Sequence, residues 1–253
     1  MAEGSASERA ARRHGAADPS IVRVRAVIAA GLEALEARRE EVNALDVGWA
    51  ADHDTGDNMV ATLRAVLDEL DRLAGDSEGR TIDEIGRAEI VASVARAALL
   101  GARGRAGVIL SQLVRGAAEE LASRPGELVD PVLIGAALSR AADQAYGSVR
   151  EPTEGTMLTV VREMAHRVAT ELAHRAEPRL AADATALEQD LVIADVIRSA
   201  LESGRQSVAR SPDRLAALRE AGVVDAGGYG IVVLIAGIAG ALSGERPHDT
   251  AAS

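Results

Sequence analysis

Apolar residues recur at steps of three and four positions along most of the chain, and this spacing constrains the fold more than any other feature. Ile21, Val24, Ile28, Leu32 and Leu35 show the pattern. Residues at this spacing share one face of an α-helix, so the pattern predicts an amphipathic helix. Comparable spacing predicts further helices over residues 59–70, 82–101, 105–123, 131–146, 155–176, 184–206 and 229–243, with a short one over 212–221. We find no convincing alternating stretch and therefore expect no β-sheet.

The connections between these predicted helices are short and rich in Gly, Pro and Asp. Short connections between long helices place consecutive helices side by side in opposite directions. We therefore expect an all-α fold, an up-and-down antiparallel bundle or ring. We find no internal repeat and no long linker. Residues 19–243 are expected to form one domain, between a disordered lead at 1–18 and a flexible tail at 244–253.

The composition supports a packed core without aromatic residues. Hydrophobic residues make up 47% of the 253 residues, Phe is absent, and aromatic residues account for 1%. A core built from Leu, Val, Ile and Ala favours close helix packing over aromatic-rich strands. The longest apolar run covers 231–242, well short of the roughly 20 residues that span a bilayer, so we expect a buried core helix and no membrane insertion.

The charge of the chain limits its partners. The formal net charge is −11 and the sequence pI is about 5.0. Nucleic acids and anionic membranes attract basic surfaces, so neither is expected as the main partner. Because Cys is absent, the chain has no disulfide framework and no thiol chemistry. We take the cytoplasm as the default location.

An acidic loop, "DHDTGDNM" at residues 52–59, stands out from the helical pattern. Asp52, Asp54 and the upstream Asp46 offer hard oxygen ligands, which suit Mg²⁺ or Ca²⁺. The spacing does not fit an EF-hand calcium loop, because Leu63 stands where the bidentate Glu belongs. A helix follows with Thr55 or Asp57 as its cap, and its free N–H groups attract anions. The loop as a whole favours a metal–phosphate site, although each Asp taken alone fits a solvated turn or a helix cap.

Three further segments differ from plain helix. Glycines in "GARGRAGVILSQ", residues 101–112, leave backbone N–H groups for an anion nest or simply form a tight turn. This segment has no Gly-Lys-Ser/Thr and follows no strand, so it is neither a P-loop nor a Rossmann fingerprint. "EGTMLTVVREM", residues 154–164, places Thr156 where it can cap a helix or meet a nucleotide, and "GVVDAGGYG", residues 222–230, sets Asp225 before Gly227 and Gly228. We read no Ser-His-Asp or Cys-His arrangement, which suits phosphoryl transfer by positioning and charge neutralisation.

These four segments together resemble a known family. "VNALDVGWAADHDTGDNM", "GARGRAGVILSQLVRG", "EGTMLTVVRE" and "GVVDAGGYG" are similar, in order, to motifs of the nucleotide-binding domain (DhaL or DAK2 type) that dihydroxyacetone kinases share with bacterial fatty acid kinases. The similarity extends over about residues 20–243 and is closer to the fatty acid kinases. It implies a DhaL-like barrel of eight antiparallel helices that binds ATP or ADP at one end through two Mg²⁺ ions.

The resemblance also assigns residues to the site. It places the metal ions on Asp46, Asp52 and Asp54. It places the nucleotide on Thr55, Gly56, Asn58, Met59, Gly104, Arg105, Ala106, Gly107, Thr156, Asp225, Gly227 and Gly228. In this family the acceptor of the phosphate is held by a dihydroxyacetone-binding subunit or by a fatty-acid-binding protein of the DegV type. The resemblance therefore implies a partner protein, and a homodimer is also possible.

The chain departs from the family pattern at four positions. Arg105 and Ala106 replace an Asn-Ser pair, His53 replaces a Gly, and Asp57 replaces a Thr. Arg105 can take over phosphate contacts, because guanidinium suits phosphate, or it can pair with Asp57. We therefore expect a kinase subunit, with two alternatives: a degenerate module that senses nucleotide or scaffolds a partner, and a purely structural helical protein.

Overall fold

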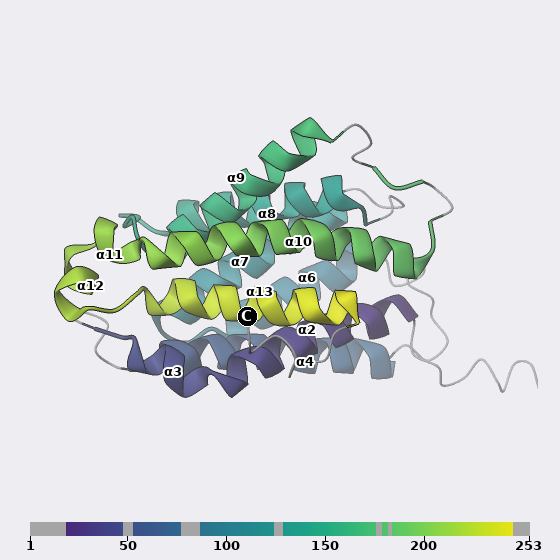
Figure 1. The fold of residues 1–253 in the computed structure, drawn as a ribbon. Helices are drawn as coiled ribbons and strands as arrows, with labels where there is room; N and C mark the ends of the chain where they lie inside the picture. The colour runs from purple at the N-terminus through teal and green to yellow at the C-terminus, as the bar shows by residue number, and fades with distance from the viewer. Residues whose placement is uncertain are drawn as a thin grey trace, which may run out of the picture.

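A computed structural model describes residues 19–47, 53–76, 87–123, 129–175, 179–181 and 184–244. Long helices account for most of these residues (Figure 1). The long ones are α2 (Pro19–Ala37), α4 (Thr55–Asp76), α6 (Arg87–Gly101), α7 (Gly104–Ser123), α8 (Pro131–Ser148), α9 (Met157–His174), α10 (Ala186–Ala209) and α13 (Ala226–Ser243). Three short ones are α3 (Arg39–Ala44), α11 (Ser211–Arg214) and α12 (Ala216–Ala221). None of the described segments forms a strand.

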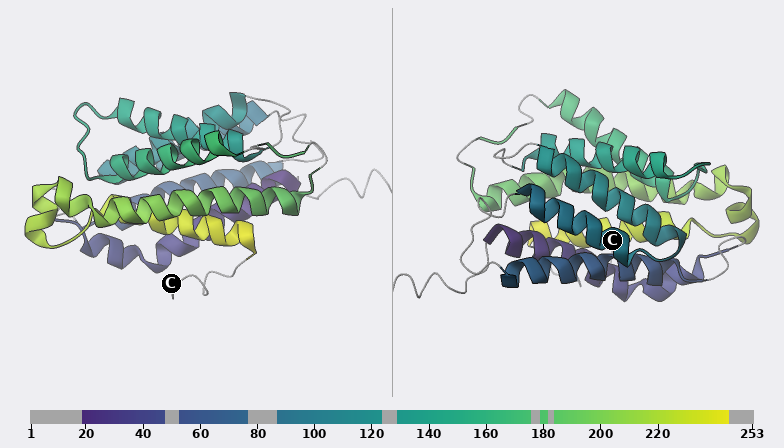
Figure 2. Two further views of the ribbon diagram at one scale, coloured as in Figure 1. Left: turned by 45° about the horizontal axis from the view of Figure 1, so that its top comes forward. Right: turned by 180° about the vertical axis from the view of Figure 1, so that it is seen from behind.

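The eight long helices form a closed ring. Each packs against the next one along the chain, and the last, α13, packs against the first, α2. Figure 2 shows this arrangement from two further sides. The expectation of an all-α, up-and-down antiparallel barrel of eight helices is confirmed. Because the direction of the chain reverses at each step, every second connection lies at the same end of the ring.

The core fills the inside of this ring with aliphatic side chains. Leu35, Met59, Leu110, Leu158 and Met164 are among its fully buried members. Many small residues, especially Ala and Gly, let the helices approach closely, as the absence of Phe leads one to expect. The main cluster of buried side chains draws on seven of the eight long helices, and a smaller cluster joins α6 to α4 through Ala98, Val66 and Leu70.

The helix boundaries follow local capping chemistry. Asp130 accepts a hydrogen bond from the Leu133 N–H at 2.8 Å and starts α8, with Pro131 at the first helical position. Thr185 and Glu188 form a reciprocal capping box at the start of α10. The short helix expected over 212–221 divides into α11 and α12, because the backbone is extended at Leu215.

Some sequence expectations fall on segments outside the description. The first residues of the predicted 82–101 helix, the proposed lead at 1–18 and nearly all of the proposed tail at 244–253 lie there.

The apolar run at 231–242 belongs to α13, which is longer than the run itself. By length and composition α13 qualifies as a possible membrane span, with a mean hydropathy of 1.8, yet half of it is buried against other helices of the ring.

Candidate functional site

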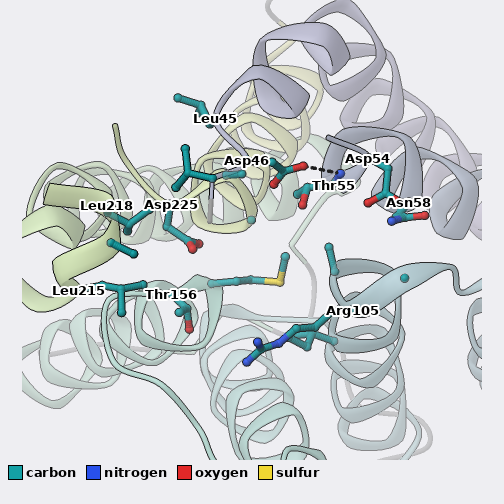
Figure 3. Close-up of a pocket in the computed structure, with 18 residues that line it drawn as sticks. Leu45, Asp46, Asp54, Thr55, Asn58, Arg105, Thr156, Leu215, Leu218 and Asp225 are labelled. Atoms are coloured by element: carbon teal, nitrogen blue, oxygen red, sulfur yellow. Dashed lines mark hydrogen bonds between the residues drawn. The ribbon is translucent and has the colours of Figure 1, made fainter. Parts of the chain in front are cut away.

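A cavity of about 180 Å³ lies at one end of the barrel (Figure 3). Four alternate connections meet there, namely α2–α4, α6–α7, α8–α9 and α10–α13. In Figure 1 this is the end that carries α3, α11 and α12. Each of the four segments that differ from plain helix in the sequence supplies part of the cavity wall. The antiparallel topology therefore explains why motifs far apart in the chain come together.

The start of α4 forms one wall and is held by side chains from the preceding segment. Asp46 is 3% exposed, and its Oδ2 accepts a hydrogen bond from the Thr55 N–H at 3.0 Å. Asn43 Oδ1 accepts hydrogen bonds from the N–H groups of Gly56 at 2.7 Å and Asp57 at 3.3 Å. The helix begins at Thr55 itself, so the prediction that Thr55 or Asp57 caps it was wrong. Asp46 and Asn43 satisfy N–H groups that we expected to remain free for an anion.

The expected metal ligands are only partly described. Asp46 and Asp54 both line the cavity, whereas Asp52 lies outside the described residues. Across the described ranges, no three His, Asp or Glu side chains form a group that could hold a metal ion. The structure thus brings two of the three carboxylates to one cavity.

Two of the departures from the family pattern lie beside this wall. His53 adopts a left-handed backbone conformation with φ of 50°, and its Nδ1 lies 3.3 Å from the carbonyl oxygen of Asn43. The Asp57 carboxylate lies 3.4 Å from Nε of Arg39 and accepts a hydrogen bond from the Asn43 side chain at 2.8 Å. Asp57 therefore pairs with α3 and is not among the residues that line the cavity.

The glycine segment forms a second wall. Gly104 has φ of +53°, and a Cβ atom there would lie 2.2 Å from Nδ2 of Asn58, so only glycine fits at the start of α7. Gly104, Arg105 and Ala106 line the cavity. Gly107 does not; a Cβ atom there would lie 2.8 Å from Oγ1 of Thr62, so this glycine permits close packing of α7 on α4.

The connection between α8 and α9 places Thr156 at the cavity. Glu154 accepts hydrogen bonds from the side chains of Thr159 at 2.9 Å and Arg162 at 2.6 Å, which anchors the loop to α9. Thr156 is buried, and its hydroxyl donates to the carbonyl oxygen of Thr153 at 2.8 Å. It precedes α9 without a side-chain capping bond.

Asp225 starts α13 and is the most perturbed acid described. Its Oδ2 accepts a hydrogen bond from the Gly228 N–H at 2.6 Å. Burial raises the pKa of the Asp225 carboxyl to about 6; the negative charge of Asp46 adds to the increase, while the N–H groups of Gly228 and Met157 and the charge of Arg105 oppose it. Two enclosed carboxylates that repel each other favour a site that takes up positive charge.

Ten of the predicted site residues line the cavity together. They are Asp46, Asp54, Thr55, Asn58, Gly104, Arg105, Ala106, Thr156, Asp225 and Gly227. The structure does not bring Gly56, Met59, Gly107 and Gly228 to its surface. Met59 is 0% exposed in the core, while Gly56 and Gly228 lie where a Cβ atom would collide with the Arg39 carbonyl oxygen and with Val160. The side chain or Cα atom at each of these positions packs against neighbouring segments and does not line the cavity.

The sequence reasoning missed the apolar part of the cavity. Leu215, Ala217 and Leu218, from α12 and the residue before it, line one side. Leu45, Val47, Ile109, Met157 and Ala226 complete the apolar lining. Apolar residues at helical spacing look the same whether they face a core or a ligand cavity. The order of the helices could have indicated these residues. In an antiparallel ring, the connection before α13 lies at the same end as the α2–α4, α6–α7 and α8–α9 connections.

Comparisons with known proteins identify the family of this chain and agree with its fold. The family model of the DAK2 domain matches residues 49–240. Protein YloV of Bacillus subtilis (strain 168) is 33% identical over 219 residues, which cover 87% of this chain and 35% of that protein. An uncharacterized protein of Staphylococcus aureus (strain USA300) is 31% identical over 220 residues, with the same coverage of 87% and 35%. The chain thus spans about a third of the length of these relatives.

Solved structures show the same fold at lower sequence identity. The dihydroxyacetone kinase from C. freundii in complex with AMP-PNP and Mg²⁺ superposes with a TM-score of 0.56 at 18% identity, covering 89% of this chain and 34% of that one. The native form of the same kinase gives a TM-score of 0.55. The matched family model covers most of the chain, including the glycine segment, the α8–α9 connection, the α10–α13 connection and the part of the acidic loop after residue 48. The chain therefore belongs to the DAK2 domain family, with the all-α fold of the corresponding domain in dihydroxyacetone kinase.

Proposed function

We propose that this chain is a Mg–ATP-binding phosphotransferase subunit of the dihydroxyacetone kinase and fatty acid kinase type. The observation that carries the proposal is the meeting of four family motifs around one cavity, with Asp46 and Asp54 on one wall and Arg105 on another. A site that combines carboxylates with a cation and backbone turns suits a metal ion bound to phosphates.

The donor set fits magnesium. Asp46 and Asp54 supply hard carboxylate oxygens, and we assign Asp52 to the same set from the family resemblance. The hydrogen bond from Thr55 uses one lone pair of Asp46 and orients its carboxylate, which retains further lone pairs for a ligand. These carboxylates would hold Mg²⁺, which we expect as two ions, and the metal would supply positive charge that neutralises the phosphates. The kinase from C. freundii was solved with AMP-PNP and Mg²⁺, which supports the same ligand class here.

The remaining cavity residues have complementary roles in this proposal. Arg105, Asn58 and Thr156 present polar groups to the phosphates, and Gly104 lets the chain turn tightly beside them. Leu215, Ala217 and Leu218 give an apolar surface for the nucleotide base. Phosphoryl transfer depends on positioning and charge neutralisation, so no nucleophilic side chain is required.

The acceptor of the phosphate belongs to a partner in this proposal. The cavity is small, and the nucleotide would fill it, so the acceptor approaches from outside. We propose a dihydroxyacetone-binding subunit or a DegV-type fatty-acid-binding protein as the partner, and the cytoplasm as the location. The greater length of the relatives supports a role alongside further domains or chains.

A non-catalytic nucleotide-binding module is the second candidate. The observation that favours it is the presence of Arg105 and Ala106 at the cavity, where the family carries an Asn-Ser pair. Both candidates require binding of nucleotide with Mg²⁺. They differ in turnover, since only a kinase subunit consumes ATP when an acceptor-loaded partner is supplied.

Calorimetric titration with Mg²⁺ alone, ATP alone and both ligands tests the shared part of these proposals. We expect ATP to bind tightly only with Mg²⁺. Asp54→Asn should weaken this binding by about tenfold or more, because it removes a charged ligand. Asp54 is half-buried, and the amide of Asn has nearly the size of its carboxylate, so the substitution leaves the fold in place.

Asp143→Asn is the matched control, because Asp143 is exposed on α8 and does not line the cavity. It should leave the affinity unchanged. Equal affinities for the two variants would contradict the assignment of Asp54, and a lack of ATP binding by the unaltered chain would contradict both candidate functions.

A further inference from the structure

Arg105 is the one basic side chain among the described residues that line the cavity. It lies in the first turn of α7, and Figure 3 shows its guanidinium extending along the cavity toward Thr156, across from Asp46 and Asp54. The same residue also lines a neighbouring hollow, formed with Val108, Ile109 and residues 148–151. Arg105 therefore stands at the boundary between the cavity and its surroundings.

The position of Arg105 is fixed by the backbone. The left-handed turn at Gly104 packs directly against the Asn58 side chain, which leaves no room for a Cβ atom there. The next turn of α7 is anchored by Gly107, whose N–H donates to the carbonyl oxygen of Arg103 at 3.0 Å and which packs against α4. Arg105 thus lines the cavity from a rigid backbone support, while part of its side chain is exposed to solvent.

Three carboxylates share the cavity with this cation. Asp46, Asp54 and Asp225 all line the cavity. The positive charge of Arg105 lowers the pKa of Asp225, so it acts on this acidic group across the space between them. A fixed cation in such a site repels a second cation and attracts an anion.

We propose that Arg105 makes the cavity selective for a metal–phosphate complex over a bare divalent cation. This inference rests on the proposed function and deepens it. Without nucleotide, Arg105 balances part of the carboxylate charge and so weakens the binding of free Mg²⁺. When the metal arrives with a polyphosphate, the guanidinium binds phosphate oxygens, and the same charge strengthens binding.

The test uses Arg105→Ala and Arg105→Lys in the full chain, with MgCl₂ alone and with ATP plus MgCl₂ as calorimetric probes. Arg105→Ala should bind free Mg²⁺ about threefold or more tightly than the unaltered chain at low salt. It should bind Mg–ATP about tenfold more weakly, because charge-assisted hydrogen bonds are lost. Arg105→Lys should keep the unaltered affinity for free Mg²⁺ and show an intermediate loss for Mg–ATP, since an ammonium lacks the planar fork.

Arg103→Ala is the matched control, because Arg103 is exposed two residues earlier, bonds the Ala102 carbonyl oxygen, and lines neither hollow. It should leave both affinities unchanged. If Arg103→Ala and Arg105→Ala changed the affinities for Mg²⁺ and Mg–ATP equally, the inference would be overturned. Unchanged or weaker Mg²⁺ binding by Arg105→Ala would overturn it as well. Either result would still be compatible with the proposed function as long as the unaltered chain binds Mg–ATP. If the unaltered chain does not bind Mg–ATP, the proposed function is overturned as well. Thermal unfolding of each variant verifies its folding, and Arg105→Gln, which also removes the charge and should show the same changes in affinity, carries the test if Arg105→Ala is unfolded.

Discussion

His53 shows how a single residue departs from the family pattern while the loop around it keeps its place. The family carries Gly at this position, and His53 adopts the left-handed conformation that glycine reaches without strain. For other residues this conformation costs about 1 kcal/mol or more. The side chain contributes one long contact to the Asn43 carbonyl oxygen, 3.3 Å away.

Replacing His53 with Gly should therefore stabilise the protein. Relief of the left-handed conformation outweighs both the lost contact and the greater freedom of glycine in the unfolded chain, so we expect a gain of up to about 1 kcal/mol. Urea unfolding measures this gain. His53→Ala is the control, because it removes the imidazole but keeps the strained backbone. A gain of the same size in His53→Ala would show that the side chain, rather than the backbone, causes the effect.

Asp225 gives the stability of the protein a distinct dependence on pH. Its pKa is about 6 in the folded state, against 3.8 for an ordinary Asp. Between these two values the folded state holds the proton that the unfolded state has released, so the free energy of unfolding falls as pH rises. The full effect is on the order of 3 kcal/mol. About one pH unit above the folded-state pKa both states are ionised, and the loss is nearly complete.

Comparison with Asp225→Asn isolates this effect from that of the other acids. An Asn at this position can still accept the Gly228 N–H that caps α13. We expect the stability of the unaltered chain relative to Asp225→Asn to fall between about pH 4 and about pH 6, as measured by urea unfolding. A stability difference that stays constant over this range would show that Asp225 titrates normally.

At the scale of the elements, the sequence predicts the long helices better than their ends. Periodicity identifies segments such as 131–146, observed as α8 at 131–148, because one buried face specifies both helix and register. The start of α4 is different. Its capping groups, Asn43 and Asp46, come from the preceding segment, so local rules for Thr55 and Asp57 gave the wrong cap. Contacts between elements decide such boundaries, and a single stretch of sequence does not contain them.

The same distinction explains which site residues could be predicted. Some polar and glycine residues can be recognised in the sequence because they interrupt a helical pattern. Asp46, Gly104 and Asp225 are examples, and all three line the cavity. Met59 and Gly107 share the same motifs but pack between helices, because adjacent residues in a helix point in different directions. Leu215 and Leu218 also line the cavity, but nothing in the sequence distinguishes them from core residues. Motif membership therefore predicts the loop, whereas the direction of each side chain depends on the packed structure.

At the scale of the whole molecule, the cavity depends on closure of the ring. The α10–α13 connection supplies Asp225 and Leu218 to the cavity, and α13 is held in place by α10 on one side and α2 on the other. The contact between α2 and α13 joins the two ends of the described chain. Glycines allow it: a Cβ atom at Gly237 would lie 2.5 Å from the Ala30 carbonyl oxygen and 3.0 Å from the Cα atom of Gly31.

Gly237→Ala should therefore loosen the barrel where it closes. The added methyl group meets backbone atoms of α2, which cannot move aside as a flexible side chain can, so we expect a loss of about 1–3 kcal/mol in the free energy of unfolding. Gly147→Ala is the matched control on α8, because a Cβ atom there has no other atom within 4 Å. That control should gain about 0.4–1 kcal/mol, since alanine restricts the unfolded chain. Equal effects of the two substitutions on urea unfolding would show that glycine conformation alone matters, and that close contact of the first and last helices does not hold the ring together.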